Sequence, residues 1–246
     1  MSHDACSTPA PGTSPRFGGD EVCVVVPMYN EATVIASVVA GLRLHFAEVV
    51  CVDDGSSDTS SDAARAAGAT VVRHATNLGQ GAALQTGISY AVRHTRARWV
   101  VTFDADGQHH PLDAVRLVDT AAQGDVDVVL GSRFLEDGAA EVPAFRRRLL
   151  KGAVRFTRMT TGLPVTDTHN GLRVFSRAAA ERLQIRSRGM CHASEILHQV
   201  AAARWRVREV PVTISYTDYS RAKGQPSINA VNVLFDLMLQ QLYPAR

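Results

Sequence analysis

The stretch that decides the fold prediction is Trp99–Pro111, which reads WVVTFDADGQHHP. Its first part, Val100–Phe103, consists of β-branched and aromatic residues, and such a run is typical of a buried strand. Gly107 ends the strand, and Pro111 suits the first turn of a following helix. The stretch therefore predicts a strand, a polar turn and a helix in succession.

The turn carries two carboxylates, Asp104 and Asp106, at the carboxyl end of the predicted strand. Ligands bind at this end of the strands in open parallel sheets. Two acids so close together need a positive partner, and a hard divalent ion with oxygen ligands is the obvious one. Read alone, the segment also fits a solvated loop rich in Asp and Gly. We expect the adjacent His109 and His110 to be solvated loop residues rather than ligands.

The same order of apolar strand, polar loop and helix recurs through the first half of the chain. We expect further strands at Val22–Val26, Val49–Val52 and Thr70–Arg73 and within residues 127–134. Strands that alternate with helices of 10–15 residues indicate βαβ units, and hence an α/β fold with a mostly parallel, Rossmann-like sheet flanked by helices. Right-handed crossovers bring the strand ends to one edge, where four polar loops converge.

The second half is less regular. A late strand is expected at Val207–Tyr216 and a closing amphipathic helix at Asn229–Leu242. Residues 143–161 read as a helix without acids, whose basic residues are Arg146, Arg147, Arg148, Lys151, Arg155 and Arg158. The Pro-, Ser- and Gly-rich residues 1–20 are expected to form a disordered arm. Neither a repeat nor a linker interrupts residues 21–246, which predicts a single domain.

Composition narrows the class of protein. A hydrophobic fraction of 46% and a charged fraction of 20% are ordinary for a soluble enzyme, and a net charge of +2 argues against a nucleic-acid partner. The four cysteines lack CxxC spacing, which fits a reducing compartment. We find neither a signal peptide nor a run of about 20 apolar residues. We therefore expect a cytoplasmic protein whose membrane contact, if any, is peripheral, at the inner face of the membrane.

Several common enzyme motifs are missing from the sequence. There is no GxGxxG after the first strand, no GxxxxGK[ST] and no GxSxG, which argues against a dinucleotide dehydrogenase, a P-loop ATPase and a serine hydrolase. An acid-lined sheet edge with a divalent ion suits a diphosphate, because the cation neutralises charge on a leaving group. The residues alone thus favour a metal-dependent transferase acting on a nucleotide-diphosphate substrate.

Seven segments then match one family in order and spacing: VVVPMYNE, VDDGSSD, NLGQGAALQTG, FDADGQ, GSRF, DTHNGLRVF and RAKGQPS. Together they resemble glycosyltransferase family 2, which has the GT-A fold, and within it the dolichyl- and polyprenyl-phosphate mannose synthase-like branch. The resemblance implies a nucleotide-binding half at about 21–135 and an acceptor-binding half at about 136–246. It implies an inverting, metal-dependent hexosyltransferase that moves a sugar from a GDP- or UDP-sugar to a polyprenyl phosphate.

The resemblance also implies roles for individual residues. The nucleotide sugar would be held by Pro27, Tyr29, Glu31, Asp53, Asp54, Asp104 and Gln108. Mg²⁺ or Mn²⁺ would be held on the diphosphate by Asp104, Asp106 and Gln108. Phosphate contacts would come from Arg133, Arg146, Arg147, Arg148, Arg221 and Lys223, because arginine binds phosphate bidentately. Asp106, Arg133 and Asp167 are the catalytic candidates.

The nature of the acceptor is left open by the sequence. A hydroxyl acceptor needs a general base, for which Asp167 and Glu195 are the candidates, whereas a lipid phosphate is already ionised. Two positions depart from the family pattern: Gln80 replaces a common lysine, and Pro226 stands where a polar residue is expected. The alternatives are a transferase of the same fold with a soluble hydroxyl acceptor, a nucleotidyltransferase, and a non-catalytic protein that binds nucleotide sugars. The sequence leaves the oligomeric state undetermined.

Overall fold

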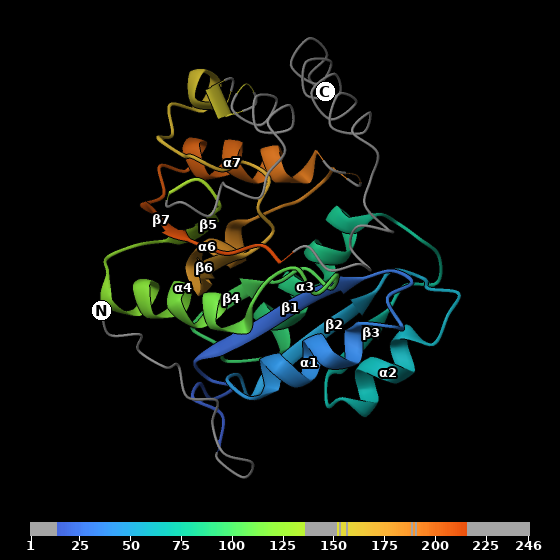
Figure 1. The fold of residues 1–246 in the computed structure, drawn as a ribbon. Helices are drawn as coiled ribbons and strands as arrows, with labels where there is room; N and C mark the ends of the chain where they lie inside the picture. The colour runs from blue at the N-terminus through green and yellow to red at the C-terminus, as the bar shows by residue number, and fades with distance from the viewer. Residues whose placement is uncertain are drawn as a thin grey trace.

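The computed structural model describes residues 14–135, 152, 154–155, 157–187, 189 and 191–215, and Figure 1 shows their arrangement. The strands are β1 (Val22–Met28), β2 (Glu48–Asp53), β3 (Thr70–Arg73), β4 (Trp99–Thr102), β5 (Val128–Ser132), β6 (Arg173–Ser176) and β7 (Val207–Pro211). The labelled helices are α1 (Ile35–Arg43), α2 (Ser60–Ala66), α3 (Gln80–His94), α4 (Pro111–Gln123), α6 (Arg177–Arg182) and α7 (His192–Ala202).

The seven strands form one sheet in the order β3-β2-β1-β4-β6-β5-β7. Strand β6 runs antiparallel to both of its neighbours, and the other neighbouring pairs are parallel. In β6, Arg173 pairs with Thr102 of β4 on one side and Leu130 of β5 on the other. The single α/β domain with a mostly parallel sheet is therefore confirmed, and the antiparallel β6 starts at the sheet edge that carries the acidic loops.

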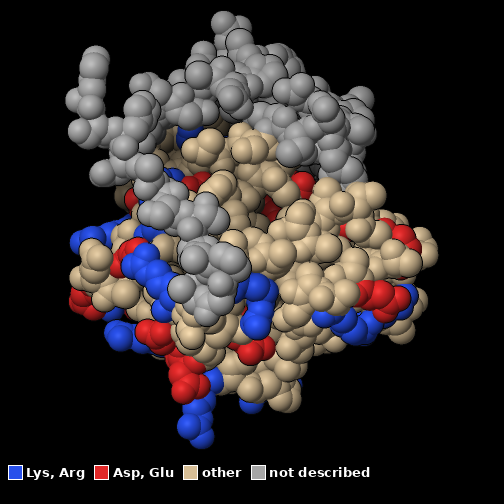
Figure 2. Space-filling view, turned by 60° about the horizontal axis from the view of Figure 1, so that its bottom comes forward, with Lys and Arg blue, Asp and Glu red and all other residues tan. Residues whose placement is uncertain are grey.

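Helices cover both faces of the sheet (Figure 1). Alternate residues of β1 point to opposite faces: Val24 lies in a core with α1 and α4, whereas Val25 lies in a core with α3, α6 and α7. Because both faces are buried, the strand is apolar along its whole length, as strands of parallel sheets are. On the face shown in Figure 2, basic and acidic side chains are interspersed, in keeping with the small net charge.

Two expected boundaries are wrong. The arm expected over residues 1–20 is ordered at Phe17, which is buried and stacks on Phe46 with ring centroids 5.4 Å apart. The late strand ends at Pro211 instead of residue 216, because after one more hydrogen bond to β5, from Val212 N to Ser132 O at 3.0 Å, the chain turns to α4, where Thr213 N donates to Asp113 Oδ2 at 3.0 Å. The expected closing helix lies outside the described residues.

Three cysteines, Cys23, Cys51 and Cys191, are buried as thiols. Burial raises the pKa of the Cys23 and Cys51 thiols to about 12, so both are inert hydrophobic side chains. None of the described helices has the length and apolar character that crossing a membrane requires.

Candidate active site

The acidic pair of the opening motif lies directly after β4, as expected. Asp104 and Asp106 are partly exposed, and the Asp104 side chain is 28% accessible. Gln108 closes the turn with its main chain, because its N–H donates to Asp106 Oδ1 at 3.0 Å and its carbonyl accepts from Ser215 N at 2.9 Å. Ser215 is the last described residue, so the segment that follows β7 arrives beside the acidic turn.

Asp104 is held from three sides. Gln80, at the start of α3, donates from Nε2 to Oδ1 at 3.3 Å, and His109 Nε2 lies 3.3 Å from Oδ2. The main chain of Gly171 covers the third side so closely that a β-carbon at that position would fall 2.1 Å from Asp104 Oδ2. The Gln80 side chain therefore contacts the first aspartate of the pair.

The expectation that His109 is solvated is wrong. His109 is buried, its ring centroid lies 5.6 Å from that of Phe103, and its main chain forms an isolated bridge with Ile214. Its Nδ1 is buried and has no hydrogen-bond partner among the described residues. His110 is exposed as expected, and it caps α4 by accepting from Leu112 N at 3.3 Å.

The two acidic pKa values are displaced in opposite directions. Burial and the nearby charge of Asp104 raise the pKa of Asp106 to about 6. For Asp104 burial also acts to raise the pKa, but the hydrogen bond and positive charge of His109, together with Arg173, outweigh it and lower the pKa. The Gln108 N–H and His109 act to lower the pKa of Asp106 but do not outweigh burial and Asp104, so Asp106 is the less compensated carboxylate of the two, and a cation bound beside it would relieve this.

The described residues contain no cluster of three or more His, Cys, Asp and Glu side chains able to enclose a metal ion by themselves. Two neighbouring carboxylates that repel each other nevertheless fit a hard divalent cation whose other ligands are phosphate oxygens or water. The donor set therefore fits an ion shared with a bound diphosphate and does not fit a closed structural metal site.

Asp53 ends β2 and Asp54 follows it, at the expected place, but both are buried and take part in internal hydrogen bonds. Asp53 accepts from Ser56 N at 2.8 Å and from the hydroxyl of Ser61. Asp54 accepts from the N–H groups of the loop before α3 and contacts His74 Nδ1 at 2.7 Å. Both carboxylates shape the loops around the predicted nucleotide site.

The end of β1 carries three of the predicted nucleotide contacts. Pro27 is buried within the strand, and Tyr29, the next residue but one, is 44% exposed at the sheet edge. Glu31 is buried, and its main-chain N–H donates to Ser60 Oγ at 2.7 Å. Tyr29 is the member of this group that presents an accessible aromatic surface to a ligand.

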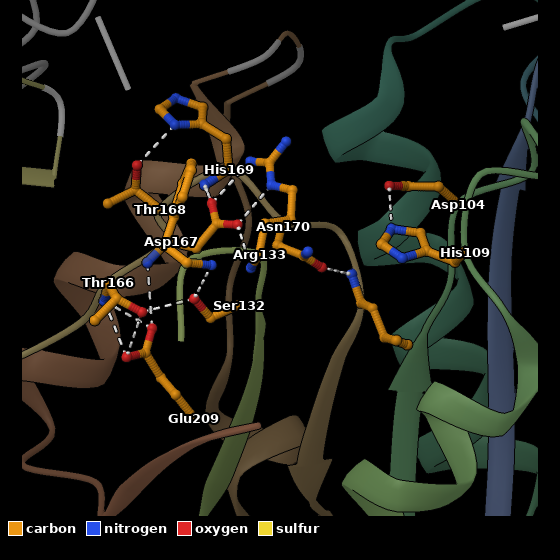
Figure 3. Close-up of polar contacts among 12 residues, drawn as sticks. Asp104, His109, Ser132, Arg133, Thr166, Asp167, Thr168, His169, Asn170 and Glu209 are labelled. Carbon is orange, nitrogen blue, oxygen red and sulfur yellow. Dashed lines mark hydrogen bonds and ion pairs between the residues drawn. The ribbon is translucent and has the colours of Figure 1, made fainter. Parts of the chain in front are cut away.

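Arg133 and Asp167, both predicted catalytic residues, form an ion pair (Figure 3). Arg133 donates from Nε at 2.6 Å and from Nη2 at 2.8 Å to the two oxygens of Asp167. Asp167 is almost fully buried and also accepts from the main chain of Arg133 and His169. Burial acts to raise the pKa of Asp167, but the Arg133 charge and these hydrogen bonds hold it below its usual range.

The other candidate base, Glu195, is in the first turn of α7. Its two oxygens accept from Arg186 N at 2.9 Å and Ser187 N at 2.8 Å, which fastens the segment before the helix. Both carboxylates that the sequence offers as a general base are therefore engaged in holding protein groups.

Sequence reasoning missed Arg173, which is buried at the start of β6 and donates to the carbonyl of Asn170 at 3.0 Å. Burial lowers the pKa of the Arg173 guanidinium to about 10, although the negative charges of Asp104 and Asp167 act to raise it. A charged residue within the apolar run LRVF was the available signal. Glu209 on β7 was also missed; it accepts hydrogen bonds from Thr166 and Asp167.

The basic residues of the second half are only partly described. The residues that lie outside the described part are Arg146, Arg147, Arg148, Lys151, Arg221 and Lys223. Arg155 and Arg158 belong to the helical stretch that reaches residue 161 and line a cavity of about 590 Å³. Its other lining residues are Phe134, Val154, Met159 and Thr166, so the cavity combines apolar and cationic side chains directly after Arg133.

Comparisons with known proteins identify relatives of this chain. A related protein of Methanocaldococcus jannaschii, the uncharacterized protein MJ1222, is 34% identical over 91% of this chain and 93% of its own. The UDP-N-acetylglucosamine–dolichyl-phosphate N-acetylglucosaminyltransferase of Methanococcus voltae is 28% identical, over 90% of this chain and 96% of its own. The polyprenol monophosphomannose synthase of Mycolicibacterium smegmatis is 29% identical, over 81% and 79%.

Among solved structures, the glucosyl-3-phosphoglycerate synthase of Mycobacterium tuberculosis in complex with phosphoglyceric acid has a TM-score of 0.67 at 21% identity, over 89% of this chain and 79% of that one. This similarity confirms the GT-A fold. The model of glycosyl transferase family 2 matches residues 23–184, which include the acidic pair, the Arg133–Asp167 ion pair and the antiparallel strand β6. The chain therefore belongs to glycosyl transferase family 2 and is a glycosyltransferase.

Proposed function

We propose that this protein transfers a sugar, with inversion at the anomeric carbon, from a nucleoside-diphosphate sugar to a polyprenyl phosphate. We choose this acceptor because the two candidate general bases, Asp167 and Glu195, are both bonded to groups of the protein. Asp167 is buried against Arg133 with a lowered pKa, and Glu195 accepts from two main-chain N–H groups. An acceptor whose nucleophilic oxygen is already ionised needs neither of them.

The donor end of the site is the acidic turn. Asp104 and Asp106 would hold Mg²⁺ or Mn²⁺ with the diphosphate, and the ion would supply neutralisation of the charge that develops on the leaving group. Gln80 and His109 keep Asp104 in a fixed orientation, so the carboxylate is pre-organised before the donor binds. Tyr29 offers its exposed ring to the nucleotide. In solved structures of the fold neighbour above, Mn²⁺ and UDP are present together.

The acceptor end is assigned to Arg133 and the cavity beside it. The ion pair with Asp167 fixes the guanidinium plane, which suits recognition of a phosphate. Arg155 and Arg158 add positive charge, while Phe134, Val154 and Met159 provide apolar surface. An anionic head joined to an apolar chain matches this combination. Arg221 and Lys223 follow Ser215, which lies beside the acidic turn, and are proposed as further phosphate contacts.

Two related proteins support the same acceptor, because their names include dolichyl phosphate and polyprenol monophosphomannose. With this acceptor the protein would work in the cytoplasm at the inner face of the membrane. The proposed reaction is one in-line displacement: a phosphate oxygen of the acceptor attacks the anomeric carbon, the bond to the diphosphate breaks, and the nucleoside diphosphate leaves with both electrons.

The test is a screen of donors against acceptors with purified protein and Mg²⁺ or Mn²⁺. The donors are GDP-mannose, UDP-glucose and UDP-N-acetylglucosamine, and the acceptors are a short polyprenyl phosphate and the matched polyprenol without phosphate. We expect release of nucleoside diphosphate and a phosphate-linked glycolipid with the phosphate acceptor only. Transfer solely to polyprenol or to water-soluble hydroxyl compounds would contradict the proposal. Asp106→Asn serves as the inactive control.

A further inference from the structure

Glu209, in the middle of the edge strand β7, accepts hydrogen bonds from two consecutive residues of the turn at Thr166 and Asp167. Thr166 N donates to its two oxygens at 2.8 and 2.9 Å, Thr166 Oγ1 lies 3.0 Å from Oε2, and Asp167 N donates to Oε1 at 3.2 Å. Within the described residues Glu209 forms no ion pair. The hydrogen bonds described for its carboxylate therefore all come from the turn at Thr166 and Asp167.

One chain of hydrogen bonds runs from this carboxylate to the main chain of the GSRF segment (Figure 3). Phe134 N donates to Ser132 Oγ at 3.2 Å, and Ser132 Oγ lies 2.6 Å from Thr166 Oγ1. Because the Thr166 hydroxyl donates its proton to Glu209, it accepts the proton of Ser132. Each hydroxyl in the chain therefore accepts from one neighbour and donates to the next, and the last acceptor is the Glu209 carboxylate.

A second chain reaches the side chain of Arg133. Glu209 fixes the main chain of Asp167, and the Asp167 carboxylate accepts from Nε, Nη2 and the main-chain N–H of Arg133. The Asp167 side chain is 1% exposed and that of Arg133 is 12% exposed, so water competes little for these bonds. Both the backbone and the guanidinium of Arg133 are therefore bonded to Asp167, whose main chain is in turn held by Glu209 of β7.

We propose that Glu209 is a positioning residue that sets the orientation of Arg133 through the Thr166–Asp167 turn. The inference rests on the proposed function in one respect, namely that Arg133 contacts a phosphate of the substrates. A bidentate contact to phosphate requires the guanidinium plane to be fixed, and a loose turn would let that plane rotate. Glu209 does not touch substrate in this proposal.

The test is a double-mutant cycle between Glu209→Gln and Arg133→Ala. Glutamine keeps the size of the side chain but replaces one acceptor oxygen by an amide donor, which faces the N–H groups of the turn. We expect Glu209→Gln alone to lower kcat/KM by about 10- to 100-fold, since small displacements of a binding group have effects of this size. In the Arg133→Ala background the same substitution should change kcat/KM by less than about threefold, because the group it positions is gone.

A full and independent loss in that background would overturn the proposal, because it would mean that Glu209 acts through general stability. The matched control is Glu181→Gln on α6, which removes a partly exposed carboxylate that pairs with Arg177 at 3.1 Å. It should leave kcat/KM unchanged.

Amide hydrogen exchange gives a second measurement that needs no activity, so a failure of the proposed function is distinguishable from a failure of this inference. We expect Glu209→Gln to speed exchange in peptides that cover 132–134 and 166–167, and Glu181→Gln to leave them unchanged. Unchanged protection at 132–134 in Glu209→Gln would overturn the proposal. Where Glu209→Gln does not fold, Thr166→Val removes only the hydroxyl link and should speed exchange at 132–134; unchanged protection there would overturn the first chain of bonds.

Discussion

Replacing Gly171 by alanine should displace Asp104 while leaving the fold intact. The added β-carbon would lie 2.1 Å from Asp104 Oδ2 and 2.5 Å from Asp104 Cγ, whereas ordinary contacts begin at 3.4 Å. The carboxylate and the facing main chain must therefore separate by about 1.3 Å, the difference between 3.4 and 2.1 Å. Displacements of about 1 Å in a catalytic site cost on the order of 100-fold in rate. We expect Gly171→Ala to lower kcat/KM by about that factor.

The control is Gly152→Ala, because no atom of the described residues lies within 4 Å of a β-carbon at that position. Binding of Mn²⁺ in the presence of nucleoside diphosphate, followed by electron paramagnetic resonance, reports on Asp104 independently of turnover. We expect weaker Mn²⁺ binding in Gly171→Ala and unchanged binding in Gly152→Ala, with similar circular dichroism spectra for both. Equal Mn²⁺ affinity and equal kcat/KM in the two variants would refute the argument that Gly171 is required by the proximity of Asp104.

Three further predictions concern the acidic turn and the candidate bases. Because the folded pKa of Asp106 is about 6 and its ordinary value is 3.8, ionisation of Asp106 destabilises the metal-free fold as the pH rises from about 4 to 6. Asp106→Asn should abolish turnover yet stabilise the metal-free protein at pH 8, on the order of 1–3 kcal/mol, with no gain at pH 3.5; thermal unfolding at both pH values checks this. Glu195→Gln should change the midpoint of unfolding without removing a limb of the pH–rate profile, whereas loss of the limb would identify Glu195 as a base. Gln80→Lys should place a positive charge beside Asp104 and weaken metal binding about tenfold in a Mn²⁺ titration; tighter binding would contradict the contact described here.

The fold was predictable because each strand of the first half is followed by turn residues and then by a segment whose apolar residues recur with the period of a helix. The strand at residues 70–73 agrees with the structure residue for residue, and the helix at Pro111 begins where the proline indicates. The late strand was predicted too long because Val212 and Ile214 continue the apolar pattern beyond Pro211, where the strand ends. Local hydrophobicity cannot distinguish a ladder partner from a residue that packs against a neighbouring helix.

Only those residues of the candidate site that belong to a recognisable sequence motif could be predicted. Asp104, Asp106 and Arg133 occupy the expected edge, but the partners that hold them come from distant segments. Glu209 lies 42 residues after Asp167, in a strand whose sequence contains no motif. His109 appeared solvated because the QHH run is polar, and its burial depends on tertiary contacts with Phe103 and Ile214. Such contacts arise from the crossover connections and leave no periodic signal.

The electrostatic arrangement explains why the acidic pair is suited to a cation that arrives with the substrate. Arg173 is a buried positive charge that interacts with Asp104 and Asp167, and with His109 it keeps the pKa of Asp104 low. Asp106 is compensated less well, since burial and the charge of Asp104 raise its pKa by more than the Gln108 N–H and His109 lower it. A protein that needed only a folded loop would be more stable with a neutral residue at position 106. The retained carboxylate is therefore best understood as a ligand whose cost in the free protein is offset when a cation and a diphosphate bind together.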